Sequence, residues 1–184
     1  MLKTLSLVAE KLYDHAILWG VGGSLLLSFY KVIDKPNDID ILVAEKNADR
    51  LNEIISSISE PKEALRTDPF RTVHFSTYRM NDIDIDVMGG FAIQHKEGVY
   101  KLSLKQESIV THKKINGVNI PLCSLEDWYI LYWLIPNKQD KVLLIEQYLK
   151  DNGVSYPHLL MEALNKPLPL EVKERIERLL SYSM

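Results

Sequence analysis

A glycine pair set between two apolar runs is the feature that most constrains how this chain can fold. Residues 16–21 read AILWGV, and Gly22, Gly23 and Ser24 follow directly. Glycine adopts backbone torsions that other residues avoid, so it lets a buried strand turn sharply into a helix. The segment therefore predicts a short buried strand, a tight turn and a helix over residues 24–31.

Two short stretches farther along the chain alternate aspartate with isoleucine. Asp38 and Asp40 are separated by one isoleucine, and Asp82, Asp84 and Asp86 repeat the alternation in the run DIDIDV. Side chains two residues apart on a strand project from the same face. Each stretch therefore predicts a strand with one acidic face, although a strand with an ordinary solvated face would show the same alternation.

The paired aspartates and the glycine turn together indicate a chemical site. Carboxylates held side by side repel one another, and a divalent cation such as Mg²⁺, which binds carboxylate and phosphate oxygens, relieves that repulsion. Glycines at the start of a helix let backbone N–H groups approach a phosphate. A Gly-Gly-Ser sequence alone is weak evidence, because a tight turn needs glycine without any ligand. Its combination with two acidic strands favours a site for a metal and a phosphate-bearing ligand.

The first part of the chain alternates between helical and strand patterns. Apolar residues recur at helical spacing up to His15, so the first helix is expected to end near that residue. Residues 38–44 form an expected strand and residues 47–58 an expected helix. Residues 72–80 and 83–89 are both typical of strands. Asn81 and Asp82 between them suit a tight turn, which predicts a hairpin.

Strand character continues to Cys123 and then changes to helical. Residues 98–104, 108–115 and 118–122 are expected strands, and Asn116-Gly117 is the strongest hairpin signal in the chain. Ser124, followed by an acidic residue three positions later, is typical of a helix start. Three or four helices are expected after it, with Gly153 as the C-terminal cap of one of them.

Composition excludes several classes of protein. The chain has 184 residues, of which 46% are hydrophobic and 26% charged, which is enough for one sizeable core. No apolar run approaches the roughly 18 residues that a membrane span needs, so we expect no membrane association. A net charge of -3 argues against a protein that coats nucleic acid with a uniformly basic surface. The single Cys123 suits a cytoplasmic location, and no oligomeric state is predicted.

Three features together form a pattern: the Gly-Gly-Ser turn, the pair Asp38 and Asp40, and a later strand aspartate in DIDVM. This pattern resembles that of the nucleotidyltransferase superfamily related to DNA polymerase beta. Its hallmark is Gly-Gly/Ser, then Asp-x-Asp/Glu, then a third acidic residue. The most similar subgroup is the small bacterial nucleotidyltransferases, which include lincosamide and aminoglycoside nucleotidyltransferases and abortive-infection-type toxins. The resemblance covers residues 16–150.

The resemblance implies an α/β (α+β) fold with a mixed β-sheet backed by helices. Residues 1–123 would form the nucleotidyltransferase catalytic core. Residues 124–184 would form a C-terminal helical segment packed on that core.

The resemblance also implies roles for individual carboxylates. Asp38 and Asp40 would bind Mg²⁺ or Mn²⁺ ions that hold a triphosphate. A third aspartate would complete the metal site and take a proton from the attacking hydroxyl. Asp86 is favoured for this third position because IDVMGG matches the family position, and Asp84 is the alternative.

Four further residues would contact the nucleotide. The resemblance places an NTP, with ATP favoured, across the turn formed by Gly22, Gly23 and Ser24. Lys138 falls in a segment that resembles the family's post-core helices, and it would reach the triphosphate. A loop lysine is more often simply solvated.

The expected reaction transfers NMP from an NTP to a hydroxyl acceptor and releases pyrophosphate. The acceptor stays unidentified: a small molecule, a protein or RNA would each be consistent with the sequence. The alternative is a non-catalytic nucleotide-binding or interaction module that retains the fold. The intact acidic set favours the enzyme.

Overall fold

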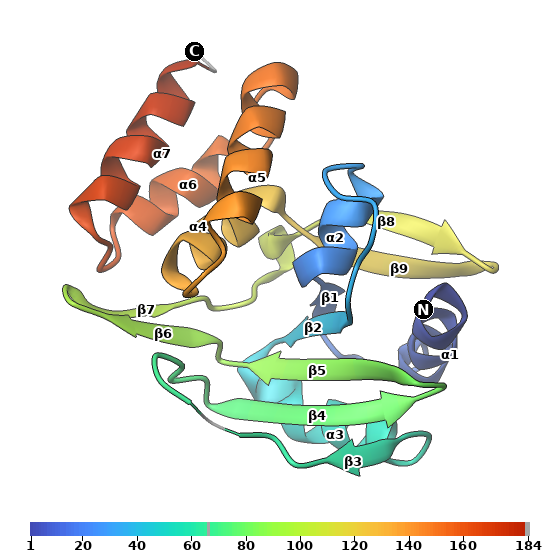
Figure 1. The fold of residues 1–184 in the computed structure, drawn as a ribbon. Coiled ribbons are helices and arrows are strands. Elements are labelled where there is room, and N and C mark those ends of the chain that lie inside the picture. Colours follow the sequence, from blue (N-terminus) through green and yellow to red (C-terminus); the bar gives the residue numbers. More distant parts are fainter. Residues whose placement is uncertain (66, 183–184) are drawn as a thin grey trace.

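The computed structural model describes residues 1–65 and 67–182. A mixed seven-stranded sheet has the order β3-β4-β5-β2-β1-β9-β8, and β6 and β7 form a separate two-stranded sheet (Figure 1). No helix within the described ranges is long and apolar enough to cross a membrane.

The elements in chain order are α1 (Leu2–Leu12), β1 (Trp19–Val21), α2 (Gly23–Phe29), β2 (Ile39–Val43), η1 (Glu45–Asn47), α3 (Ala48–Ser56), β3 (Glu60–Lys62), β4 (His74–Met80), β5 (Ile83–Gly89), β6 (Ala92–His95), β7 (Gly98–Lys101), η2 (Gln106–Ser108), β8 (Ile109–Ile115), β9 (Val118–Cys123), α4 (Leu125–Leu134), α5 (Gln139–Asn152), α6 (Pro157–Leu164) and α7 (Leu170–Tyr182).

The centre of the large sheet mixes parallel and antiparallel pairs. Strand β1 pairs antiparallel with β2 and parallel with β9, while β2 pairs parallel with β5. Alternate residues of β2 and β5 are apolar and fully buried, including Ile39, Ile41, Ile85 and Val87. The expectation of a mixed sheet backed by helices is confirmed.

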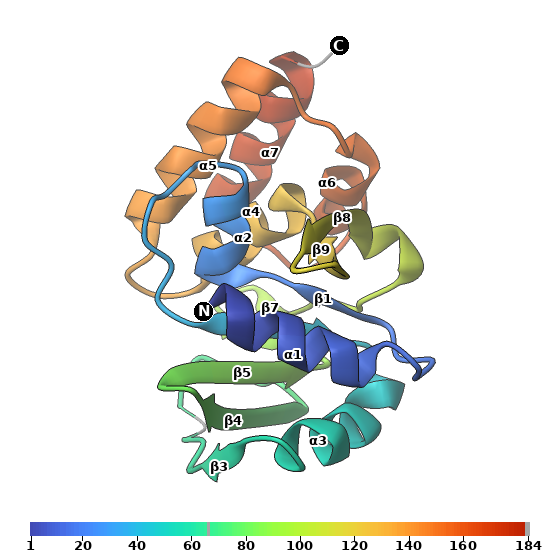
Figure 2. The ribbon, with the colours of Figure 1, turned by 90° about the vertical axis from the view of Figure 1, so that its right-hand side faces the viewer.

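Helices cover the sheet in two groups. Helices α1 and α3 contact each other, and α3 also packs against β4 and β5. Figure 2 shows α4, α5, α6 and α7 gathered at the opposite end of the molecule from β3, β4 and α3. Helix α4 contacts α2 as well as α5 and α6, so it connects this helical group to the sheet.

Both hairpins expected from turn sequences are present. Asn81 and Asp82 have φ of 52° and 61°, and Asn116 and Gly117 have φ of 50° and 86°. Two consecutive positive φ values are the geometry of type I′ turns, whose twist matches that of the flanking strands. These turns join β4 to β5 and β8 to β9.

Two strands lie where none was expected. Strand β3 is an exposed three-residue edge strand containing Pro61, and β6 pairs with β7 outside the main sheet. Proline within a short exposed segment gives no strand pattern, although an edge strand tolerates it. The expected strand over residues 98–104 is shorter than predicted, because β7 ends at Lys101.

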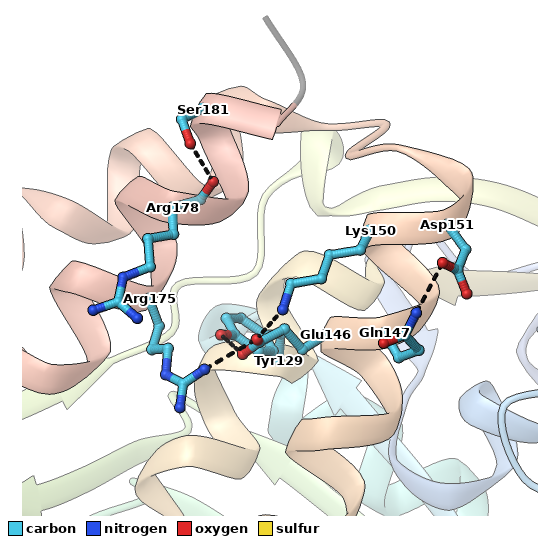
Figure 3. Close-up of polar contacts among 8 residues, drawn as sticks. All are labelled: Tyr129, Glu146, Gln147, Lys150, Asp151, Arg175, Arg178 and Ser181. Atoms are coloured by element: carbon cyan, nitrogen blue, oxygen red, sulfur yellow. Dashed lines mark hydrogen bonds and ion pairs between the residues drawn. The ribbon is translucent and has the colours of Figure 1, made fainter.

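Four described helices follow Cys123, and a buried carboxylate joins three of them (Figure 3). The hydroxyl of Ser124 accepts a 3.0 Å hydrogen bond from the backbone of Asp127 and caps α4. The Glu146 side chain on α5 accepts from the Tyr129 hydroxyl at 2.9 Å and from Lys150 at 2.7 Å. It also accepts from Arg175 of α7 at 3.1 Å. The division of the chain into two units at Cys123 stays a prediction.

Candidate active site

The pairing of β2 with β5 brings two of the expected aspartates side by side. Asp40 and Asp86 are direct partners in the parallel register, and Asp38 precedes the first residue of β2. One carboxylate oxygen from each of the three residues lies within 4.8 Å of the others. Asp38, Asp40 and Asp86 are called the acidic cluster below.

Neutral hydroxyl groups hold two members of the acidic cluster. Ser24 donates to Asp38 Oδ1 at 3.3 Å and accepts from the backbone N–H of Asn37 at 3.0 Å. Thr77 is the cross-strand partner of Asp86 and donates to its Oδ1 at 2.7 Å. These hydroxyls fix the positions of the carboxylates but do not neutralise their charge.

The electrostatics of the acidic cluster oppose ionisation. Burial, and then the neighbouring carboxylates of Asp38 and Asp86, raise the pKa of Asp40 from 3.8 to about 8. Burial also raises the pKa of Asp86, while its hydrogen bond from Thr77 works in the opposite direction. No described Lys, Arg or His forms an ion pair with any of the three carboxylates. A ligand with positive charge would relieve this repulsion.

The other two aspartates of the DIDIDV run lie outside the acidic cluster. Asp84 accepts a 2.8 Å hydrogen bond from Lys62 and lies 3.6 Å from Arg79, and the bond from Lys62 is the main cause of its lowered pKa. Asp82 lies in the exposed turn before β5. The expectation that all three aspartates share one strand face is therefore wrong for Asp82. The structure brings Asp86, and not Asp84, to Asp38 and Asp40.

The glycine pair accommodates two side chains of the site. Gly23 has φ of +59°, and a Cβ atom there would overlap the carboxylate of Asp40. A Cβ at Gly22 would overlap the ring of Trp128, and the Gly22 N–H donates to the Asp40 carbonyl at 2.9 Å. Only glycine therefore lets the turn approach β2 and α4 this closely.

A cleft of about 350 Å³ opens over the acidic cluster. Its walls are largely apolar and aromatic, and two lysines of the α5 region also line it. Gly22, Gly23 and Ser24 do not line this cleft, and Ser24 is buried at 1% exposure beneath Asp38. The lining includes Asn37, Asp38, Asp40, Asp86, Phe70, Phe75, Met88, Phe91, Trp128, Tyr132, Ile135, Lys138 and Lys141.

Lys141 is a cleft residue that the sequence analysis missed. It lies one helical turn after Lys138, and its Nζ is 5.1 Å from the centroid of the Tyr132 ring. Burial lowers the pKa of Lys141, with the positive charge of Lys138 acting in the same direction, while Asp40 and Asp38 oppose the shift. Residues three apart on a helix lie on the same side, so KQDK was the available signal.

The fold matches solved nucleotidyltransferase structures. The crystal structure of a proposed nucleotidyltransferase from Thermotoga maritima matches with a TM-score of 0.61 and 23% sequence identity, over 82% of this chain and 93% of that chain. The crystal structure of ANT(2″)-Ia in complex with adenylyl-2″-tobramycin matches with a TM-score of 0.54 and 14% identity, over 97% and 98%. This chain has the nucleotidyltransferase fold. No protein-family model matches the sequence, and no curated protein matches it.

Within this nucleotidyltransferase fold, the acidic cluster fits a divalent cation. Carboxylate oxygens are the hard ligands that Mg²⁺ and Mn²⁺ accept, and three of them converge within 4.8 Å. The repulsion that raises the pKa of Asp40 also favours a cation at this place. Lys138 and Lys141, which line the same cleft, suit a negatively charged ligand.

Proposed function

We propose that this protein is a metal-dependent nucleotidyltransferase that transfers NMP from an NTP to a hydroxyl acceptor. The observation that carries the proposal is the convergence of Asp38, Asp40 and Asp86 in a cleft that also contains Lys138 and Lys141. Phosphoryl-type transfer depends mainly on positioning and on neutralising charge, so this sparse set of residues is chemically sufficient.

The three carboxylates have different tasks in this proposal. Asp38 and Asp40 would hold Mg²⁺ or Mn²⁺, and Asp86 would hold the ion from the adjacent strand. A metal held there would neutralise charge on the phosphate groups of the nucleotide. Asp86 also accepts the proton of the acceptor hydroxyl. Its hydrogen bond from Thr77 orients the carboxylate for that task.

Two sets of residues orient the nucleotide. Lys138 and Lys141 contact the triphosphate from the side of α5. Gly22, Gly23 and Ser24 act indirectly, because the turn they form packs against Asp40 and Asp38 and fixes the carboxylates that face the nucleotide. The acceptor oxygen attacks the α-phosphorus, the bond from that phosphorus to the bridging oxygen breaks, and pyrophosphate leaves with the electron pair.

ATP is the favoured donor. ANT(2″)-Ia was solved with adenylyl-2″-tobramycin, a product that carries an adenylyl group. The shared fold supports the same donor here. The acceptor would be a small molecule, a protein hydroxyl or an RNA end.

The decisive experiment follows the label of α-³²P-ATP. The purified protein is incubated with labelled ATP, Mg²⁺ or Mn²⁺ and fractionated cell extract, and radioactivity is followed into acceptor and pyrophosphate fractions. Transfer should require the metal and should disappear in Asp40→Asn, because that variant lacks the central carboxylate of the acidic cluster. Nucleotide binding without metal-dependent label transfer, with every extract fraction, would instead indicate a non-catalytic nucleotide-binding module.

A further inference from the structure

A second cavity of about 240 Å³ borders helix α4 and shares no lining residue with the cleft. Segment 102–108, α4 and α6 contribute to its walls. The charged residues of this second cavity are Asp127 from α4, Glu162 and Lys166 from the α6 region, and Lys105 and Glu107 from segment 102–108. Its chemistry is therefore separate from that of the acidic cluster.

Asp127 is a buried carboxylate with an unused hydrogen-bonding atom. Its side chain belongs to a residue only 4% exposed, and its Oδ2 accepts no hydrogen bond from any described residue. Burial is the main cause that raises the pKa of Asp127 to about 6, while a hydrogen bond with Ser124 lowers it. Buried polar atoms are nearly always paired, so an unpaired carboxylate oxygen on a residue that lines a cavity indicates a donor from outside the chain.

The lysines of the second cavity are occupied by a different carboxylate. Lys105 lies 2.8 Å from Glu162 and Lys166 lies 3.6 Å from the same oxygen. Neither lysine forms an ion pair with Asp127. With histidine counted as neutral, the three lining carboxylates and two lysines give the lining a formal net charge of -1.

We propose that this second cavity binds a small protonated primary amine whose N–H group donates to Asp127 Oδ2. One positive charge balances the charge of the lining, and the N–H supplies the donor that the carboxylate lacks. A divalent metal fits less well, because two ammonium groups already line the cavity and the formal net charge of its lining is only -1. A volume of about 240 Å³ has room for an amine with a short carbon chain.

Two cations that differ in their donors test the proposal on the unaltered protein. Methylammonium carries N–H donors, whereas tetramethylammonium carries the same charge and none. Backbone amide NMR titrations at constant ionic strength, without nucleotide or divalent metal, should show saturable shifts near Asp127 and in α6 with methylammonium only. Equal effects of the two cations, or no saturable shift with either, would overturn the proposal and leave a buried water as the donor.

A pair of variants identifies the carboxylate responsible. Asp127→Asn should weaken methylammonium binding at least about tenfold, because a hydrogen bond between charged groups exceeds the free energy of a tenfold change. Glu107→Gln removes the same charge from an exposed residue lining the same cavity and should change the affinity less than about twofold, as expected of solvent-screened charges. Equal losses in both variants, or an unchanged affinity in Asp127→Asn, would contradict the assignment. If Asp127→Asn does not fold, the comparison of the two cations decides the question alone.

Discussion

The carboxylate of Glu146 and the three carboxylates of the acidic cluster are all buried or partly buried, but their surroundings are opposite. Glu146, at 4% exposure, accepts hydrogen bonds from Tyr129, Lys150 and Arg175, and its hydrogen bonds lower its pKa against the effect of burial (Figure 3). The acidic cluster instead brings three carboxylates within 4.8 Å of one another without an ion pair to any described basic residue. The carboxylate of Glu146 therefore has hydrogen-bond and ion-pair partners, whereas the three carboxylates of the acidic cluster repel one another.

The difference separates a structural role from a ligand-binding role. Glu146 joins α4, α5 and α7, so its partners all belong to the chain and nothing further has to bind. The acidic cluster has hydroxyl partners that position it, but it forms no ion pair with a basic residue in the described part of the chain. A carboxylate cluster that raises its own pKa is costly, and such groups are concentrated at functional sites.

The largest expected effect is a loss of activity on substitution of Asp86 that substitution of its strand neighbour Asp84 should not cause. Asp86→Asn should lower kcat for label transfer by about 10³-fold, because in the proposed mechanism it removes both a metal ligand and the proton acceptor. ATP binding should persist through Asp38 and Asp40. Asp84→Asn is the matched control, since Asp84 is held by Lys62 and Arg79 outside the acidic cluster.

The two variants can contradict the assignment in distinct ways. Kinetics of both should be measured with saturating Mg²⁺ and compared with nucleotide affinity. An inactive Asp84→Asn beside a fully active Asp86→Asn would move the third ligand to Asp84. Full activity of both variants would reject a catalytic role for this strand.

The next largest effect concerns the contact between the turn and the acidic cluster. Gly23→Ala should lower transfer by about 10²-fold, because the new Cβ would overlap the Asp40 carboxylate and displace it. Gly117→Ala is the control: that glycine also has positive φ, but nothing lies within 4 Å of its hypothetical Cβ. Both variants should lose stability, measured by denaturant unfolding, while only Gly23→Ala should lose activity per folded molecule. Unchanged transfer in folded Gly23→Ala would mean that the turn is not coupled to Asp40.

The sequence was sufficient to predict the three residues of the acidic cluster. It was not sufficient to exclude Asp84 as the alternative third carboxylate. Alternation of aspartate with buried isoleucine predicts both strands locally, and Asn81-Asp82 predicts the hairpin between β4 and β5. The partner that removes Asp84 from consideration is Lys62, which lies on β3, an exposed edge strand without a recognisable pattern. The pairing of Asp40 with Asp86 depends on a parallel register between distant segments.

Other features depended on packing that a sequence does not display. Lys141 is one of several lysines near α5, and only the position of that helix over the cleft distinguishes it from a solvated side chain. The reason for glycine at position 22 is the ring of Trp128, which lies on a helix far along the chain. The strand β6 was missed because its partner is β7 rather than the main sheet.

A smaller effect is expected when the hydrogen-bonded carboxylate of Glu146 is replaced by an amide. Glu146→Gln should lower the free energy of unfolding by about 2 kcal/mol, the value typical of a hydrogen bond to a charged group. The amide can still accept from Tyr129, but it loses the charge that pairs with Lys150 and Arg175. Urea unfolding should report the loss, while kcat per folded molecule stays unchanged. A loss of transfer without a loss of stability would show that Glu146 serves the site rather than the helices.

The smallest effect has the opposite sign and belongs to the acidic cluster. Asp40→Asn should raise the free energy of unfolding of the metal-free protein by about 1 kcal/mol at pH 8, because it removes one charge from the cluster. The folded-state pKa of Asp40 is raised, so the folded protein retains a proton that the unfolded chain releases above about pH 4. Wild-type stability should therefore fall as pH rises from 4 to 8, and Asp40→Asn should reduce that fall. Added Mg²⁺ should restore stability at pH 8 to the wild type and much less to the variant. A variant less stable than the wild type at pH 8 without metal would show that the Asp40 carboxylate stabilises the fold, as Glu146 does, and would remove the contrast between the two sets.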